Sequence, residues 1–130
     1  MEIAGTGFVL LRGPDPVPLL RARFPEFVAS ADVEFDDDEP YFAYGMFADF
    51  LSRQRADQDL WARAISFLND LVSNTPSLHD LVSVAVLEPL ADDIDLIRVL
   101  KAELSPAARA IVEDIERTRL AYHKGPNVPD

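Results

Sequence analysis

The sequence of 130 residues contains no cysteine, which excludes disulfides, thiolate metal sites and cysteine nucleophiles. It also has no run of about eighteen apolar residues, the length that a membrane-spanning helix needs. The first residues carry an acid, Glu2, where a secretory signal has basic residues, and the apolar run 8–11 is too short for a signal core. We therefore expect a cytoplasmic protein without a membrane partner.

Motifs that carry known catalytic chemistry are missing as well. There is no HExxH, Gly-x-Ser-x-Gly, P-loop or Gly-x-Gly-x-x-Gly pattern, and glycine occurs only five times. The two histidines, His79 and His123, stand beside Asp80 and Tyr122, which do not complete a recognisable catalytic unit, so both are expected at the surface. The prediction is a protein without enzymatic activity, cofactor or metal; a small hydrolase that uses His79 is the weaker alternative.

Basic residues are absent from residues 24–52, which carry eight of the 23 acids. Five of the eight fall within residues 34–39, named here the acidic segment: Glu34, Asp36, Asp37, Asp38 and Glu39. The whole chain has a net charge of −11. Negative charge of this density repels nucleic acid and anionic lipid, and it attracts a cation or a basic protein surface. Nucleic acid is therefore not expected as a ligand.

A divalent cation is the first ligand to weigh for clustered carboxylates. A calcium loop needs glycine at its sixth position for a sharp turn and usually glutamate at its twelfth. Counted from Asp32, the sixth position is Asp37, so the spacing does not fit an EF-hand. Two interpretations remain: a solvated acidic loop, or a docking surface for a basic protein whose association rate the charge would raise.

Apolar residues recur at spacings of three and four through most of the chain, which predicts amphipathic helices. Proline, aspartate and serine mark their starts, since these residues suit the first positions of a helix. We expect a single all-α domain over 1–130, with five to six helices in an antiparallel bundle or a short α-solenoid-like stack. The predicted helices span residues 17–24, 40 to about 51, 58–74, 78–87, 94–104 and 106–123.

The segments outside these helices have simpler expectations. Residues 1–14 would form an extended arm or a short strand, residues 28–39 an acidic loop, and residues 124–130 a loose tail. The helix over 78–87 is apolar nearly all round, which is typical of a central, buried helix. Pro89 and the pair Asp92-Asp93 are expected to mark the next start.

An aromatic run, residues 41–47, begins the helix that follows the acidic segment. Gly45 inside this helix costs about 1 kcal/mol relative to alanine, so it indicates the close approach of another helix. Core packing is the favoured role for most of the run. One helix cannot bury every side, however, and we expect Tyr41 and Tyr44 to show a ring face or a hydroxyl to a partner, since tyrosine is enriched at interface hot spots.

Four stretches of the chain carry a family resemblance: the run 39–51 with its Glu-Pro-Tyr start and Gly45, Phe24-Pro25-Glu26-Phe27, residues 86–90, and residues 104–109. Over about residues 17–117 they resemble a family of small helical bacterial domains of unknown function. Members of that family look like immunity proteins of polymorphic toxin systems, which implies an acidic cytoplasmic protein without catalysis of its own. The chain differs from the family in the length and charge of residues 30–39.

The expected function is binding. Charge and resemblance together predict a protein that neutralises a cognate toxin, a basic effector domain such as a nuclease, by occluding its active site. The alternative is a helical scaffold or adaptor that has no toxin partner. The residues expected at the partner surface are Glu34, Asp36, Asp37, Asp38, Glu39, Tyr41 and Tyr44.

Overall fold

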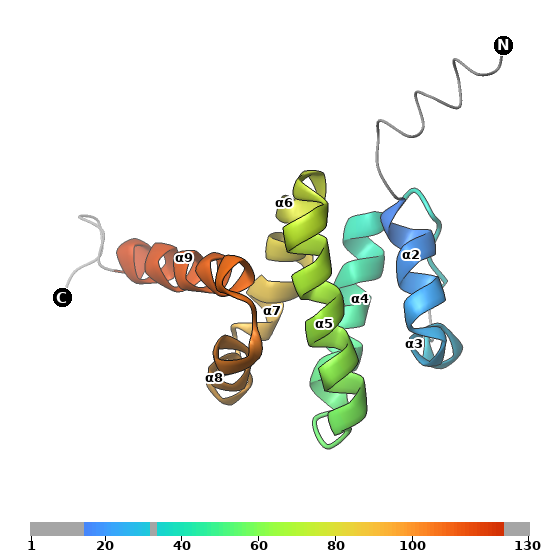
Figure 1. Cartoon of the computed structure of the whole chain (residues 1–130), viewed down its shortest axis with the longest axis horizontal. Helices are drawn as coiled ribbons and strands as arrows, with labels where there is room; N and C mark the ends of the chain where they lie inside the picture. Colours follow the sequence, from blue (N-terminus) through green and yellow to red (C-terminus); the bar gives the residue numbers. More distant parts are fainter. Residues whose placement is uncertain (1–14, 32–33, 124–130) are drawn as a thin grey trace, which may run out of the picture.

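The computed structural model describes residues 15–31 and 34–123 (Figure 1). Every regular element in that part of the chain is a helix, so the predicted all-α class is confirmed. The predicted arm (1–14) and tail (124–130) lie outside the described residues. None of the described helices combines the length and the apolar content that crossing a bilayer requires. The elements are α2 (Pro16–Arg23), α3 (Pro25–Ser30), α4 (Pro40–Arg53), α5 (Gln58–Asn74), η1 (Pro76–Leu78), α6 (His79–Leu81), η2 (Val82–Leu87), α7 (Glu88–Leu90), α8 (Ile94–Glu103) and α9 (Pro106–His123).

Proline and capping side chains begin most helices at the predicted places. Proline occupies the first turn of α2, α3 and α4, where its missing N–H would have had no partner within the helix. The carboxylate of Asp57 accepts the Leu60 N–H at 3.1 Å at the start of α5. Asp93 accepts the N–H groups of Asp95 and Leu96 at the start of α8. These bonds satisfy backbone donors that the helix itself leaves unpaired.

Residues 76–90 form one continuous helical segment, in place of a helix that ends before Pro89. Its middle, η2, is a π-helix. Pro89 has no N–H to give to the carbonyl of Ala85, and its ring would crowd that carbonyl in a regular α-helix. The wider π turns accommodate the proline, so the chain passes through it without a break. Ser77 with Asp80 three residues on resembles a capping box in the sequence, but η1 and α6 begin without a side-chain cap bond.

This segment is the central helix that its apolar sequence predicts. It packs against α4, α5 and α9, and Val86 and Leu87 are fully buried. Aromatic rings extend the core on the side of α2 and α3: the Phe24 ring lies 4.7 Å from that of Phe47 and 5.3 Å from that of Phe67. Figure 1 shows α9 running crosswise to α5, so the helix axes are not all antiparallel. The buried side chains nevertheless form one core cluster.

The acidic loop is shorter than the predicted 28–39, because residues 25–30 form α3. Residues 32–33 lie outside the described part. The loop then ends in a turn in which the Glu39 N–H donates to the Asp36 carbonyl at 3.0 Å. This turn leads directly into α4.

Candidate partner-binding surface

One buried aromatic residue holds the acidic segment against the rest of the molecule. Phe35 is 6 % exposed; its ring stacks on Phe27 with the centroids 5.7 Å apart, and the Arg21 guanidinium lies 4.4 Å from its centroid. Arg21 also donates hydrogen bonds to the Phe35 carbonyl at 2.6 Å and to the Asp37 carboxylate at 3.1 Å. With Phe35 in the core, the backbone of the segment is fixed and its acids lie in solvent.

Four acids of the segment are exposed and have no ion pair with a basic side chain in the described part of the chain: Glu34, Asp36, Asp38 and Glu39. Asp37 differs, since it pairs with Arg21. The Glu39 carboxylate accepts the backbone N–H of Asp36 at 3.0 Å, which adds a second bond to the turn. The expected exposure of these carboxylates is confirmed, and their contact with a partner stays a prediction.

Basic side chains are nearly all used within the molecule. Most of their ion pairs are well exposed, so each contributes little to stability. Their larger effect is on the charge of the surface. A base that is already paired with one acid cannot neutralise another, so the remaining acids keep their negative charge. Of the ten Lys and Arg residues in the described part, nine pair with Asp or Glu: Arg21, Arg23, Arg53, Arg55, Arg63, Arg98, Lys101, Arg117 and Arg119.

Tyr41, the first aromatic residue of α4, is 49 % exposed, as expected. Its hydroxyl donates a hydrogen bond to the carboxylate of Asp80 on α6. Only the neutral phenol can donate this bond, so the bond raises the pKa of Tyr41 above its usual range. The hydroxyl is thus already used within the molecule, and Tyr41 can offer a partner mainly its ring.

Tyr44 was expected at the partner surface, and this expectation is wrong. The side chain is fully buried, and its hydroxyl donates a hydrogen bond to the Pro16 carbonyl at 2.8 Å. Burial raises the pKa of Tyr44 well above its usual range, because the phenolate would lose its hydration. Tyr44 shares the core face of α4 with Phe47 and Leu51, three and seven residues further on. Phe42 is 46 % exposed instead.

That exposed phenylalanine lies in a groove between α3 and α4, named here the α3–α4 groove. Its volume is about 460 Å³. Phe42, Met46 and Phe50 line the α4 wall at intervals of four residues, and Asp49 pairs with Arg53 at 2.9 Å beside them. The α3 wall consists of Phe27, Ser30 and Ala31. The sequence alone does not indicate this groove, because its walls are more than ten residues apart along the chain.

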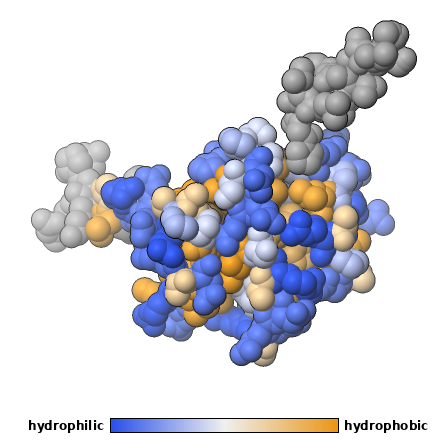
Figure 2. Space-filling view, viewed as in Figure 1, coloured by the Kyte–Doolittle hydropathy of each residue, from blue (hydrophilic) through white to orange (hydrophobic). Residues whose placement is uncertain are grey.

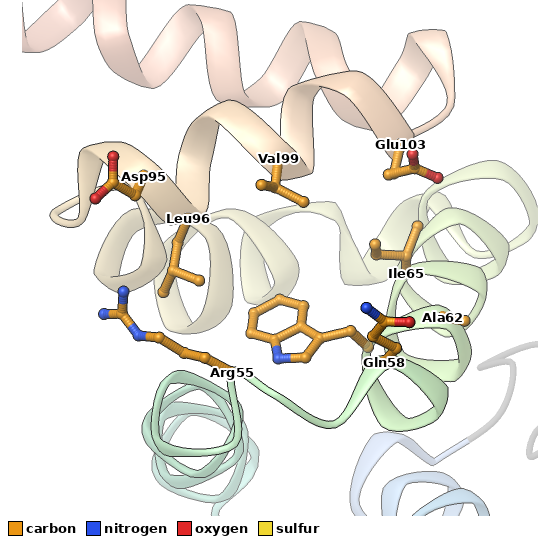
Figure 3. Close-up of a pocket in the computed structure, with 9 residues that line it drawn as sticks. Arg55, Gln58, Ala62, Ile65, Asp95, Leu96, Val99 and Glu103 are labelled. Carbon is orange, nitrogen blue, oxygen red and sulfur yellow. The ribbon is translucent and has the colours of Figure 1, made fainter.

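A second groove, the α5–α8 groove, has a volume of about 630 Å³ and includes Trp61 in its lining. Figure 3 shows Leu96 and Val99 of α8 along one side of the groove, with Leu96 toward Arg55 at one end and with Ile65 of α5 near Glu103 at the other. The guanidinium of Arg55 is engaged by the carboxylate of Asp93. Figure 2 shows how hydrophobic side chains reach the surface in patches among hydrophilic ones. The charge at this groove is balanced more evenly than at the acidic segment.

A third hollow brings together residue types that catalyse hydrolysis. His79, Ser83 and Asp114 all line it. Within the described residues, however, no hydrogen bond joins His79 to either of the others. Since a nucleophile must be within hydrogen-bond reach of its base, this arrangement gives the hydrolase alternative no geometric support. The side chain of His123 lies outside the described part.

Across residues 15–31 and 34–123, no three His, Asp or Glu side chains converge in a way that could hold a metal ion. The candidate partner-binding surface consists of the acidic segment, the ring of Tyr41 and the neighbouring α3–α4 groove. No family model, curated protein or solved structure matches the chain.

Proposed function

We propose that this protein is an immunity protein that neutralises a cognate toxin, a basic effector domain, by binding over its active site. The observation that carries the proposal is the division of charge. Nine of ten described basic residues are paired internally, whereas Glu34, Asp36, Asp38 and Glu39 are exposed without a described basic partner. A surface of this kind attracts a positively charged protein and repels nucleic acid.

The physical mechanism would be steering followed by occlusion. An effector that cleaves nucleic acid needs a cationic groove for its substrate, and four ordered carboxylates on a fixed turn can enter such a groove as a competitor. The charges raise the association rate and select the partner, while the exposed aromatic residues beside them supply affinity. The resemblance to immunity proteins of polymorphic toxin systems supports the same assignment.

A helical scaffold or adaptor without a toxin is the second candidate. The α5–α8 groove favours it, because this groove is a second apolar surface that the toxin mechanism does not use. The gene order distinguishes the two: a toxin gene directly upstream is expected for an immunity protein and not for a general adaptor.

The test begins with the basic effector encoded beside this gene. Co-expression of the protein should restore growth to bacteria that express the effector, and purified protein should inhibit the effector at a stoichiometry of one to one. The triple variant Glu34→Lys, Asp36→Lys, Asp38→Lys should slow association at low salt by about 10- to 100-fold, because the steering field is lost. The difference should shrink at 0.5 M salt, where the Debye length falls to a few ångströms.

The control is Glu88→Lys, Glu103→Lys, Glu113→Lys, which changes the net charge equally at exposed acids outside the acidic segment. Its association rate should fall much less. Equal loss in both variants would refute the surface assignment, and failure of the unmodified protein to restore growth would refute the immunity function itself.

A further inference from the structure

We propose that the α3–α4 groove receives the apolar face of an amphipathic, basic helix of the partner. The inference rests on the proposed function and deepens it by naming the part of the partner that is bound. Three observations support it: the spacing of the groove residues, the charge around the groove, and the position of Phe42 outside the core cluster.

The α4 wall of the groove presents Phe42, Met46 and Phe50 at intervals of four residues. On an α-helix this spacing makes a stripe roughly 12 Å long, since each residue rises about 1.5 Å. Such a stripe matches two turns of a second helix that places large apolar side chains at positions i, i+4 and i+7. Met46 adds adaptability, because the flexible thioether fits irregular surfaces.

The charge around the groove selects a basic helix. Glu39 stands just before α4, three residues ahead of Phe42, and is exposed. On the α3 side, Ala31 lines both the groove and a neighbouring hollow that includes Glu34. The one base in the groove lining, Arg53, is already paired with Asp49. Lysine or arginine residues that flank the apolar face of a bound helix would therefore meet carboxylates at both walls.

Of the three apolar residues on the α4 wall, Phe42 is the most exposed. Phe42 is 46 % exposed and is not part of the core cluster, whereas Met46 and Phe50 are partly buried and pack against that cluster. A large exposed aromatic side chain next to a groove is typical of an interface anchor. Phe42→Ala therefore separates binding from folding, because a surface substitution of this kind should change stability very little.

The experiment uses a fluorescently labelled peptide of about 16 residues, long enough to form a helix, with Leu and Phe on one face and Lys elsewhere. Fluorescence anisotropy gives its Kd for the unmodified protein, for Phe42→Ala and for Val99→Ala, which truncates an exposed apolar residue in the α5–α8 groove. We expect Phe42→Ala to weaken binding at least about tenfold and Val99→Ala to leave it unchanged. A peptide of the same charge with Ser in place of Leu and Phe should bind weakly and should not distinguish the variants.

Three results would overturn the proposal: no binding of the amphipathic peptide, equal binding by Phe42→Ala, or equal affinity for the serine peptide. Circular dichroism of each variant should match that of the unmodified protein, so a loss of binding is not a loss of fold. The toxin assay separates this proposal from the function on which it rests. If neutralisation depends on the acidic segment but not on Phe42, the groove proposal is refuted and the immunity function stands. If the peptide binds but the protein does not neutralise the toxin, the immunity function is refuted and the groove remains a helix-binding site.

Discussion

At the scale of single residues, the hydroxyl of Tyr44 joins two helices from a buried side chain, whereas the hydroxyl of Tyr41 forms its bond at the surface. It donates to the Pro16 carbonyl at 2.8 Å from a fully buried position and so ties α4 to the beginning of α2. The ring packs 6.3 Å from that of Phe67, in a stacked arrangement.

Tyr44→Phe should lower the free energy of unfolding at pH 7 by about 1 kcal/mol, the usual net value of a buried hydrogen bond. At alkaline pH the difference should reverse, so that the unmodified protein becomes less stable than Tyr44→Phe. Because burial raises the folded-state pKa of Tyr44, its contribution is complete below the unfolded-state pKa of about 10 and is lost as the pH rises above it. The unmodified protein should lose up to about 1.4 kcal/mol per pH unit from this group, and the Phe variant should not.

Urea unfolding followed by circular dichroism between pH 7 and pH 11 measures this difference. Tyr41→Phe is the comparison, because its hydroxyl is exposed and its pKa is raised mainly by the bond to the exposed Asp80, so its effect on the pH slope should be smaller. Identical pH slopes for the unmodified protein and Tyr44→Phe would mean that the phenol of Tyr44 ionises without cost, which contradicts its burial.

At the scale of the helix, features that depend on residues close together in the sequence could be predicted, and features that depend on distant residues could not. Helix starts at Pro40, Asp57 and Asp93 were predictable, because a cap or a first-turn proline acts within three residues of the chain. The burial of Tyr44 was missed, although its spacing of three and seven residues to Phe47 and Leu51 places it on the core face of α4. Its hydroxyl bonds to the Pro16 carbonyl, 28 residues away, which no local pattern indicates. The α3–α4 groove depends on how two helices meet in space, and the sequence contains no local signal for it.

The glycine of α4 gives a prediction at the same scale. Gly45 was expected to permit close helix packing, but a Cβ built there would lie 4.0 Å from its nearest neighbour, the Ala85 carbonyl oxygen. That distance is an ordinary van der Waals contact, so alanine fits. Gly45→Ala should therefore stabilise the protein by about 0.5–1 kcal/mol, through higher helix propensity and a less flexible unfolded chain.

Equilibrium urea unfolding of Gly45→Ala provides the measurement. Ala62→Gly, at an exposed position of α5, calibrates the same exchange in the opposite direction and should destabilise by a similar amount. A loss of stability in Gly45→Ala would show that α4 and η2 lie too close together for the added methyl group, in contradiction of the 4.0 Å distance to the Ala85 carbonyl oxygen.

At the scale of the whole molecule, charge opposes the fold that carries it. The net charge is −11, and exposed acids outnumber the bases that could offset them. Self-repulsion of this kind destabilises a compact state. The ion pairs contribute little stability in return, because they all have substantially exposed members. Stability therefore does not account for the acidic segment, which agrees with the binding role that we propose for it.

Salt should therefore stabilise this protein. Raising NaCl from 10 mM to 500 mM shortens the Debye length from about 30 Å to less than 5 Å, which weakens repulsion across the molecule more than it weakens contact ion pairs. The midpoint of thermal unfolding should rise by about 2–5 °C, measured through the fluorescence of Trp61, the one tryptophan of the chain. In the variant Glu88→Gln, Glu103→Gln, Glu113→Gln, three fewer negative charges should make the rise smaller. A midpoint that falls with salt would mean that the ion pairs outweigh the repulsion, and the acids would then need a structural explanation in place of a functional one.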